Sequence, residues 1–157
     1  MMCDENNKPV TILLIDDDPD CRMLIRDAIS ECKVTNAVLE AGNGAQAIAM
    51  LHERAAAKNG EMPGLIYLDI EMPQMDGIAT LEKLKADPTL RHIPVVMMTG
   101  VSDETQMRKA ASLGANSYTL KPANAEQFLR TVLASTNYWL AIHQYPDHRL
   151  PQELCRR

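Results

Sequence analysis

The chain has 157 residues, of which 46% are hydrophobic, and it carries a formal net charge of −5. This composition excludes a disordered chain and fits one domain with a core of ordinary size. The negative charge argues against non-specific binding to nucleic acid or anionic membranes. No apolar stretch approaches the roughly 20 residues needed to cross a bilayer. No secretory signal is visible at the N-terminus, so we expect a cytoplasmic location.

Short apolar runs alternate with segments of helical periodicity along the chain. The expected strands cover residues 10–15, 34–40, 65–68, 93–98 and 116–120. The expected helices cover residues 19–32, 45–58, 78–86, 103–113 and 124 onward. In the second helix, the spacing of Ile48, Leu51 and Ala55 predicts that all three face the core. Regular alternation of strand and helix predicts an α/β protein with a doubly wound parallel sheet.

Carboxylates follow two of the apolar runs at the point where each strand is expected to end. Asp16 and Asp17 follow Ile12–Ile15, and Asp69 follows Leu65–Leu68. In a parallel sheet these side chains reach the same edge, where ligands bind in α/β proteins. Crowded carboxylates repel one another, and a hard cation such as Mg²⁺ relieves the repulsion. The alternative is that the first acidic cluster is only a solvated, helix-capping turn.

Two further strands are followed by groups that suit an anionic ligand. Thr99 and Gly100 follow the fourth strand, and Lys121 follows the fifth. Thr99 offers a hydroxyl donor, Lys121 offers a compact cation, and Gly100 leaves room for a ligand to approach the backbone. Carboxylates, a hydroxyl and an ammonium at one edge suit a phosphoryl group with Mg²⁺, because phosphoryl transfer needs mainly positioning and charge neutralisation.

Taken together, these motifs resemble the receiver domain of response regulators, the phosphoacceptor module of two-component signalling. The motifs are Asp16–Asp17, the strand ending at Asp69 with Met72–Pro73 and Asp76–Gly77, Thr99, and Lys121–Pro122. The resemblance covers about residues 8–135 and implies a flavodoxin-like sheet with strand order 2-1-3-4-5. Residues 87–94, 121–124 and 138–140 are similar to the small regulators that accompany bacterial phytochromes.

The resemblance implies that Asp69 accepts a phosphoryl group from the phosphohistidine of a sensor histidine kinase, and the similarity to phytochrome-associated regulators suggests a kinase of the phytochrome type. The resemblance to receiver domains further implies that Asp17 ligates Mg²⁺ directly and that Asp16 helps to bind the ion, often through a water molecule. Asp69 and the backbone carbonyl of Glu71 complete the implied metal ligands. Output would then be by protein–protein contact, without an enzymatic activity toward another substrate.

The resemblance also implies which residues contact the phosphoryl group. Thr99 and Lys121 would meet its oxygens, and Tyr118 matches the switch aromatic of the family. Two positions depart from the family pattern. Gly100 stands where many members carry Ala or Ser, and Ala123 stands where Phe often follows Lys-Pro.

The last helix is expected to continue past the length needed to cover the sheet. Its extension contains Tyr138, Trp139 and Leu140, which form either core or an exposed partner surface. We favour the surface, and the resemblance to phytochrome-associated regulators suggests a two-fold homodimer formed by the fifth strand, the last helix and its extension over residues 138–142. The domain is expected to cover residues 8–143, with residues 144–157 as a tail.

Two rival functions share parts of this pattern. Asp16-Asp17-Asp18 after an apolar strand also fits an aspartate-dependent phosphohydrolase of the haloacid-dehalogenase type, with Asp16 as nucleophile and Asp18 as general acid. That class also needs an acidic pair after its lysine, and only Glu126 lies between Lys121 and Asp147. The second rival is a receiver-like scaffold that is never phosphorylated, which the intact set of acidic, hydroxyl and lysine groups disfavours.

Overall fold

The protein forms a five-stranded parallel sheet with helices on both faces. The computed structural model describes residues 10–31, 37–57, 60–72, 75–100 and 102–141. The strands are β1 Ile12–Ile15, β2 Val38–Ala41, β3 Leu65–Asp69, β4 Val95–Thr99 and β5 Ser117–Leu120. The helices are α1 Pro19–Ser30, α2 Gly44–Ala56, α3 Gly77–Ala86, α4 Glu104–Ser112 and α5 Ala125–Ala141. The strand order is β2-β1-β3-β4-β5, which confirms the predicted fold class and topology.

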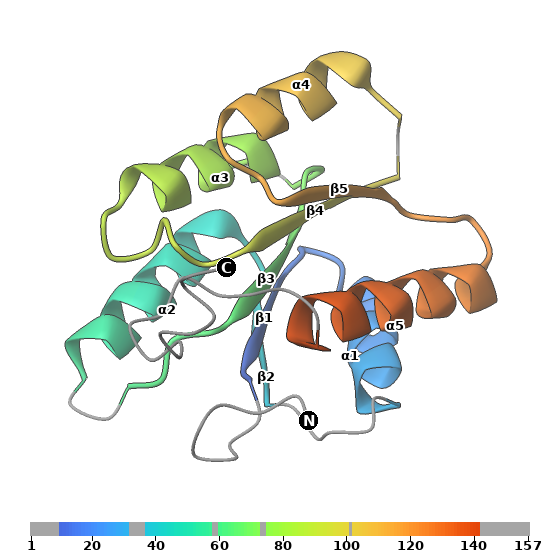
Figure 1. The fold of residues 1–157 in the computed structure, drawn as a ribbon, viewed down its shortest axis with the longest axis horizontal. Coiled ribbons are helices and arrows are strands. Elements are labelled where there is room, and N and C mark those ends of the chain that lie inside the picture. Colours follow the sequence, from blue (N-terminus) through green and yellow to red (C-terminus); the bar gives the residue numbers. More distant parts are fainter. Residues whose placement is uncertain (1–9, 32–36, 58–59, 73–74, 101, 142–157) are drawn as a thin grey trace, which may run out of the picture.

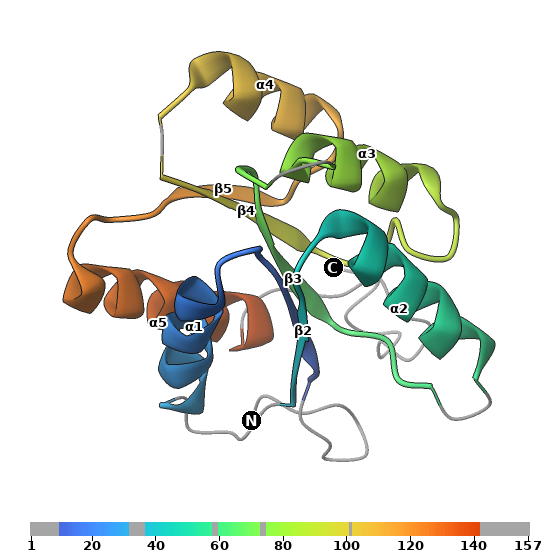
Figure 2. The same ribbon diagram turned by 180° about the vertical axis from the view of Figure 1, so that it is seen from behind.

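The helices separate into two layers. Figure 1 shows α1 and α5 on one side of the sheet and α2, α3 and α4 on the other, and Figure 2 shows the same division from behind. Each layer covers its own hydrophobic cluster. Successive residues of a strand serve opposite clusters, so that Leu13 packs toward the second layer and Leu14 toward the first. The central strands are therefore buried on both faces, as their continuous apolar runs predict.

Polar residues placed just before the helices explain where four of them begin. A capping side chain accepts a hydrogen bond from a backbone N–H of the first turn in each case, and the caps are Asp18, Asn43, Asp76 and Asp103. Pro19 occupies the first turn of α1, where its missing N–H is not needed. Gly114, with φ of 98°, follows α4 in a conformation that other residues rarely adopt.

The structure corrects two local predictions. Ala55 is exposed, because the buried stripe of α2 runs through Ala47 and Leu51 and continues to half-buried Arg54, whose guanidinium donates to the Glu61 carbonyl. The second strand begins at Val38, and the first four residues of its predicted range lie partly outside the described part of the chain.

None of the helices in the described ranges combines the length and apolar character that a membrane crossing requires.

Candidate functional site

Three carboxylates meet at the carboxyl edge of the sheet. β1 and β3 are paired neighbours in which Ile15 lies opposite Leu68, so the next residues, Asp16 just after β1 and Asp69 at the end of β3, lie side by side. Carboxylate oxygens of Asp16, Asp17 and Asp69 all lie within 4.8 Å of one another. Asp16 and Asp69 are buried, whereas Asp17 faces solvent. The sheet topology thus brings together the acidic residues that the sequence predicted to be neighbours.

Lys121 joins this cluster from the end of β5. Its Nζ lies 3.0 Å from Asp16 Oδ2 and 3.2 Å from Asp69 Oδ1. The backbone N–H of Lys121 donates to the Thr99 carbonyl at 2.6 Å, which ties the ends of β4 and β5 together. One ammonium against three carboxylates leaves an excess of negative charge, which a divalent cation would neutralise.

Burial and like charge control the ionisation of the cluster. Burial, followed by the negative charge of Asp16, raises the pKa of Asp69 to about 6, although Lys121 opposes the shift. Burial alone would lower the pKa of Lys121, but the charges of Asp16 and Asp69 outweigh it and raise that pKa. Lys121 therefore stays cationic at neutral pH, and the Asp69 carboxylate is held in a costly ionised state.

Asp16 is held in place by several contacts, and the sequence did not indicate them. Arg22 Nη1 donates to the Asp16 carbonyl at 2.5 Å, and Arg22 Nε donates to Glu40 Oε1 on β2 at 3.1 Å. The Asp16 carboxylate accepts the backbone N–H of Asp18 at 2.9 Å. Burial, followed by the neighbouring Asp16 carboxylate, raises the pKa of Cys21 to about 12, so this thiol stays protonated. No sequence pattern links Arg22 to Glu40, because the contact depends on how α1 lies over β2.

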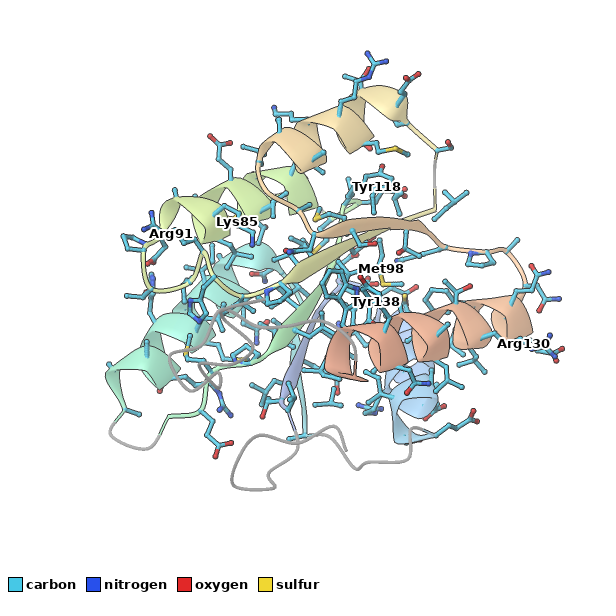
Figure 3. All side chains as sticks on the ribbon, viewed as in Figure 1. Lys85, Arg91, Met98, Tyr118, Arg130 and Tyr138 are labelled. Atoms are coloured by element: carbon cyan, nitrogen blue, oxygen red, sulfur yellow. The ribbon has the colours of Figure 1, made fainter. Side chains whose placement is uncertain are left out.

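The residues predicted to contact the phosphoryl group, apart from Lys121, lie near the side chain of Glu71. Thr99 Oγ1 donates a hydrogen bond to Glu71 Oε1 at 2.9 Å. Gly100 is exposed, and a Cβ placed there would meet only Glu71 Oε1, at 3.9 Å. The Tyr118 side chain lies between β5 and α4 (Figure 3), and its hydroxyl is buried. The resemblance implies a role for the backbone carbonyl of Glu71, whereas the structure also engages its side chain.

The extension of α5 corrects a third prediction. Trp139 is only 7% exposed and packs in the same cluster as Phe128 and Val132, so it is a core residue and not part of an exposed patch. Tyr138 stays 48% exposed and meets the Trp139 ring edge-on at 5.2 Å between centroids. The Leu140 side chain lies outside the described part of the structure. An amphipathic pattern cannot distinguish burial against the chain's own sheet from burial against a partner.

The phosphohydrolase alternative finds little support in this geometry. Asp18, its proposed general acid, is exposed and caps α1, where its Oδ1 accepts the backbone N–H of Asp20 at 2.9 Å. A carboxylate that serves as a helix cap is oriented toward backbone amides. The buried pair at the site is instead Asp16 with Asp69, contributed by different strands.

Comparisons with known proteins agree with this arrangement. The family model of the response regulator receiver domain matches residues 12–133. The response regulator Rcp1 of Synechocystis is 30% identical over 139 residues, covering 88% of this chain and 95% of that protein. The crystal structure of the phosphorylated cyanobacterial phytochrome response regulator RcpA superposes with a TM-score of 0.81 at 31% identity, covering 88% of this chain and 99% of that one. The Mn²⁺-bound form of Rcp1 gives a TM-score of 0.80 at 27% identity, covering 88% and 100%.

Fold and site together define a doubly wound signalling domain with an acidic centre at the carboxyl ends of its strands. The chain belongs to the response regulator receiver domain family, and its similarity extends over nearly the full length of the response regulator Rcp1 and of the phytochrome response regulator RcpA.

Proposed function

We propose that the protein is a response regulator that accepts a phosphoryl group on Asp69 from a phosphohistidine of a sensor kinase. The observation that carries this proposal is the buried Asp69 carboxylate, clustered with Asp16 and Asp17 and contacted by Lys121 at 3.2 Å. In the transfer, an Asp69 oxygen bonds to phosphorus as the phosphorus–nitrogen bond of the donor breaks, and the histidine ring keeps that electron pair. The Lys121 ammonium lies where it can stabilise the charge on the transferred oxygens.

Mg²⁺ is the cofactor that this donor set fits. The three carboxylates supply only oxygen ligands, and their excess negative charge favours a divalent cation. Asp17 and Asp69, with the Glu71 carbonyl, are the proposed ligands, and Asp16 assists through its buried carboxylate. Bound there, Mg²⁺ would neutralise charge on the phosphoryl oxygens and on the crowded carboxylates. The solved Mn²⁺-bound form of Rcp1 supports a divalent-metal site in this family.

Phosphorylation with a small phosphodonor tests the assignment. Acetyl phosphate with Mg²⁺ should add the mass of one phosphoryl group to the wild-type chain, as measured by intact-mass spectrometry. Asp69→Asn keeps the shape of the side chain and removes the nucleophile, so it should stay unlabelled and folded. Labelling of Asp69→Asn together with no labelling of Asp16→Asn would favour the phosphohydrolase, and an unlabelled wild-type protein would favour the scaffold.

The proposed kinase partner is a sensor of the phytochrome type, in the cytoplasm. The similarity to RcpA, whose structure is that of a phosphorylated phytochrome response regulator, supports this choice. Phosphotransfer profiling identifies the donor: each of a panel of labelled kinases is mixed with the protein, and the cognate kinase loses its label first. A non-phytochrome kinase that transfers fastest would refute the partner and leave Asp69 as the acceptor.

We also propose a homodimer whose interface includes Tyr138. Its 48% exposed aromatic ring supports this position, because Tyr is frequent among residues that dominate interface energetics. Light scattering over a range of concentrations should show a dimer that Tyr138→Ala converts to monomer. A wild-type protein that stays monomeric with and without phosphorylation would exclude the dimer.

A further inference from the structure

The side chain of Glu71 meets the one hydroxyl that the proposed phosphosite offers to an incoming phosphoryl group. Glu71 lies two residues after Asp69, and Thr99 ends the neighbouring strand β4. Thr99 Oγ1 donates to Glu71 Oε1 at 2.9 Å, although the two residues lie 28 positions apart in the chain. An ionised carboxylate only accepts hydrogen bonds, so the single hydroxyl proton of Thr99 is committed to Glu71.

The surroundings show why the glutamate can reach this position. The space beside Gly100 is open, and even a Cβ there would lie at an ordinary contact distance of 3.9 Å from Glu71 Oε1. Tyr118 borders the same region, and its buried hydroxyl lies close enough to Thr99 for a side-chain hydrogen bond to oppose the rise of its pKa. Burial, followed by the charges of Asp103 and Glu71, raises the pKa of Tyr118, so its hydroxyl stays protonated. Glu71 itself is exposed and has an open route toward solvent.

We propose that Glu71 is a positioning residue that competes with the phosphoryl group for the Thr99 hydroxyl, so that phosphorylation must break the Glu71–Thr99 hydrogen bond. The inference rests on Asp69 being the phosphoacceptor. A phosphoryl group brings three acceptor oxygens and additional negative charge. Thr99 has one proton and can donate it to one of the two acceptors at a time. The added charge also repels the Glu71 carboxylate, whose exposed side chain swings away toward solvent.

This competition would set how strongly the unphosphorylated state is favoured. A contact present in one state and absent from the other shifts the equilibrium by its own free energy. A charge-assisted hydrogen bond on a partly exposed site corresponds to roughly a three- to tenfold change in an equilibrium constant. Removing the Glu71 carboxylate should therefore strengthen binding of a phosphoryl mimic by about this factor.

The test measures binding of beryllium fluoride with Mg²⁺, a mimic of the aspartyl phosphate, to four proteins. These are wild type, Glu71→Ala, Thr99→Val and the double variant, and each retains the Glu71 backbone carbonyl and Asp69. Glu71→Ala should bind the mimic roughly three- to tenfold more tightly than wild type. In the Thr99→Val background the same substitution should have a clearly smaller effect, because no hydroxyl proton remains to compete for and only the charge repulsion is removed.

Two further variants separate the hydrogen bond from simple charge. Glu71→Gln keeps a carbonyl acceptor for Thr99 without the charge, so its affinity should fall between those of wild type and Glu71→Ala. Glu126→Ala removes an equally negative side chain on α5, where it pairs with Arg130, and should leave affinity unchanged. An equal effect of Glu71→Ala with and without the Thr99 hydroxyl would overturn the competition and leave only repulsion.

A readout without any phosphoryl mimic completes the test. Urea unfolding of the same four proteins should give a favourable coupling between Glu71 and Thr99, and zero coupling would overturn the inference. The two proposals fail differently. If wild type takes up neither the mimic nor acetyl phosphate, the phosphoacceptor assignment is wrong and the competition falls with it. If wild type takes them up and the coupling is absent, only the role of Glu71 is wrong.

Discussion

Replacing Asp69 by Asn should stabilise the metal-free protein at neutral pH. The pKa of Asp69 is raised from 3.8 to about 6 because the carboxylate is buried beside Asp16. A difference of about two pH units corresponds to roughly 3 kcal/mol if it is converted in full. Exposed Asp17 shows that solvent reaches the cluster, and screening reduces the expected gain to about 1–2 kcal/mol. Lys121 keeps its 3.0 Å contact with Asp16 in the variant, so the cation is not left without a partner.

The direction of the pH dependence follows from the raised pKa. Below the unfolded pKa of about 4, Asp69 is protonated in both states and costs nothing, so wild type and Asp69→Asn should be equally stable. The advantage of the variant should grow between about pH 4 and 6 and stay constant above that range. Urea unfolding in metal-free buffer measures the difference in stability between the variant and wild type. Asp27 is exposed on α1, so Asp27→Asn is the control for the loss of one negative charge. Equal stability of wild type and Asp69→Asn near neutral pH would refute the charge argument, whereas added Mg²⁺ should stabilise wild type more.

Three other substitutions test the packing around the site, and a fourth tests a surface pair. Trp139→Ala should destabilise the fold by about 3 kcal/mol in urea unfolding, because the ring is buried in the core. Tyr67→Phe should cost about 1 kcal/mol, since the Tyr67 hydroxyl bonds buried Thr136 Oγ1 at 2.7 Å. Gly77→Ala should lower both stability and acetyl-phosphate labelling, because its Cβ would lie 2.2 Å from a backbone oxygen at the end of β3. Asp87→Asn should lower the urea midpoint near neutral pH. Hydrogen bonds lower the pKa of Asp87 to about 2, and the bond with His52 is the largest cause. The difference in midpoint between the variant and wild type should therefore vanish as pH falls through about 2.

The acidic centre could be predicted from sequence because it follows from regular geometry. Parallel strands that end in the same direction bring their next residues to one edge, and only the strand order must be known to pair Asp16 with Asp69. Lys121 follows from the same rule, since β5 ends at that edge. These contacts depend on backbone topology and not on side-chain conformation.

The contacts that could not be predicted depend on side-chain conformation and on packing between layers. Glu71 was expected to contribute its backbone, and its bond to Thr99 depends on a rotamer that no local pattern specifies. Trp139 was placed on the surface because helical periodicity shows an apolar face without showing what covers it. The Tyr67–Thr136 hydrogen bond, between residues 69 positions apart, helps fix the end of α5 over the sheet and so buries the indole.

The packing of the helices near the site determines which elements can move at low free-energy cost when Asp69 changes. Thr99 and Lys121 end β4 and β5, and the backbone bond between them joins the two strands at the site. The adjacent helix α4 buries only Ala110 among its residues, whereas α3 buries five residues, including Leu81. An element with few buried apolar contacts moves at low free-energy cost. If phosphorylation of Asp69 draws Thr99 toward it and releases Glu71 as proposed, the shift should therefore meet little resistance along β5 and α4, where Tyr118 lies between them.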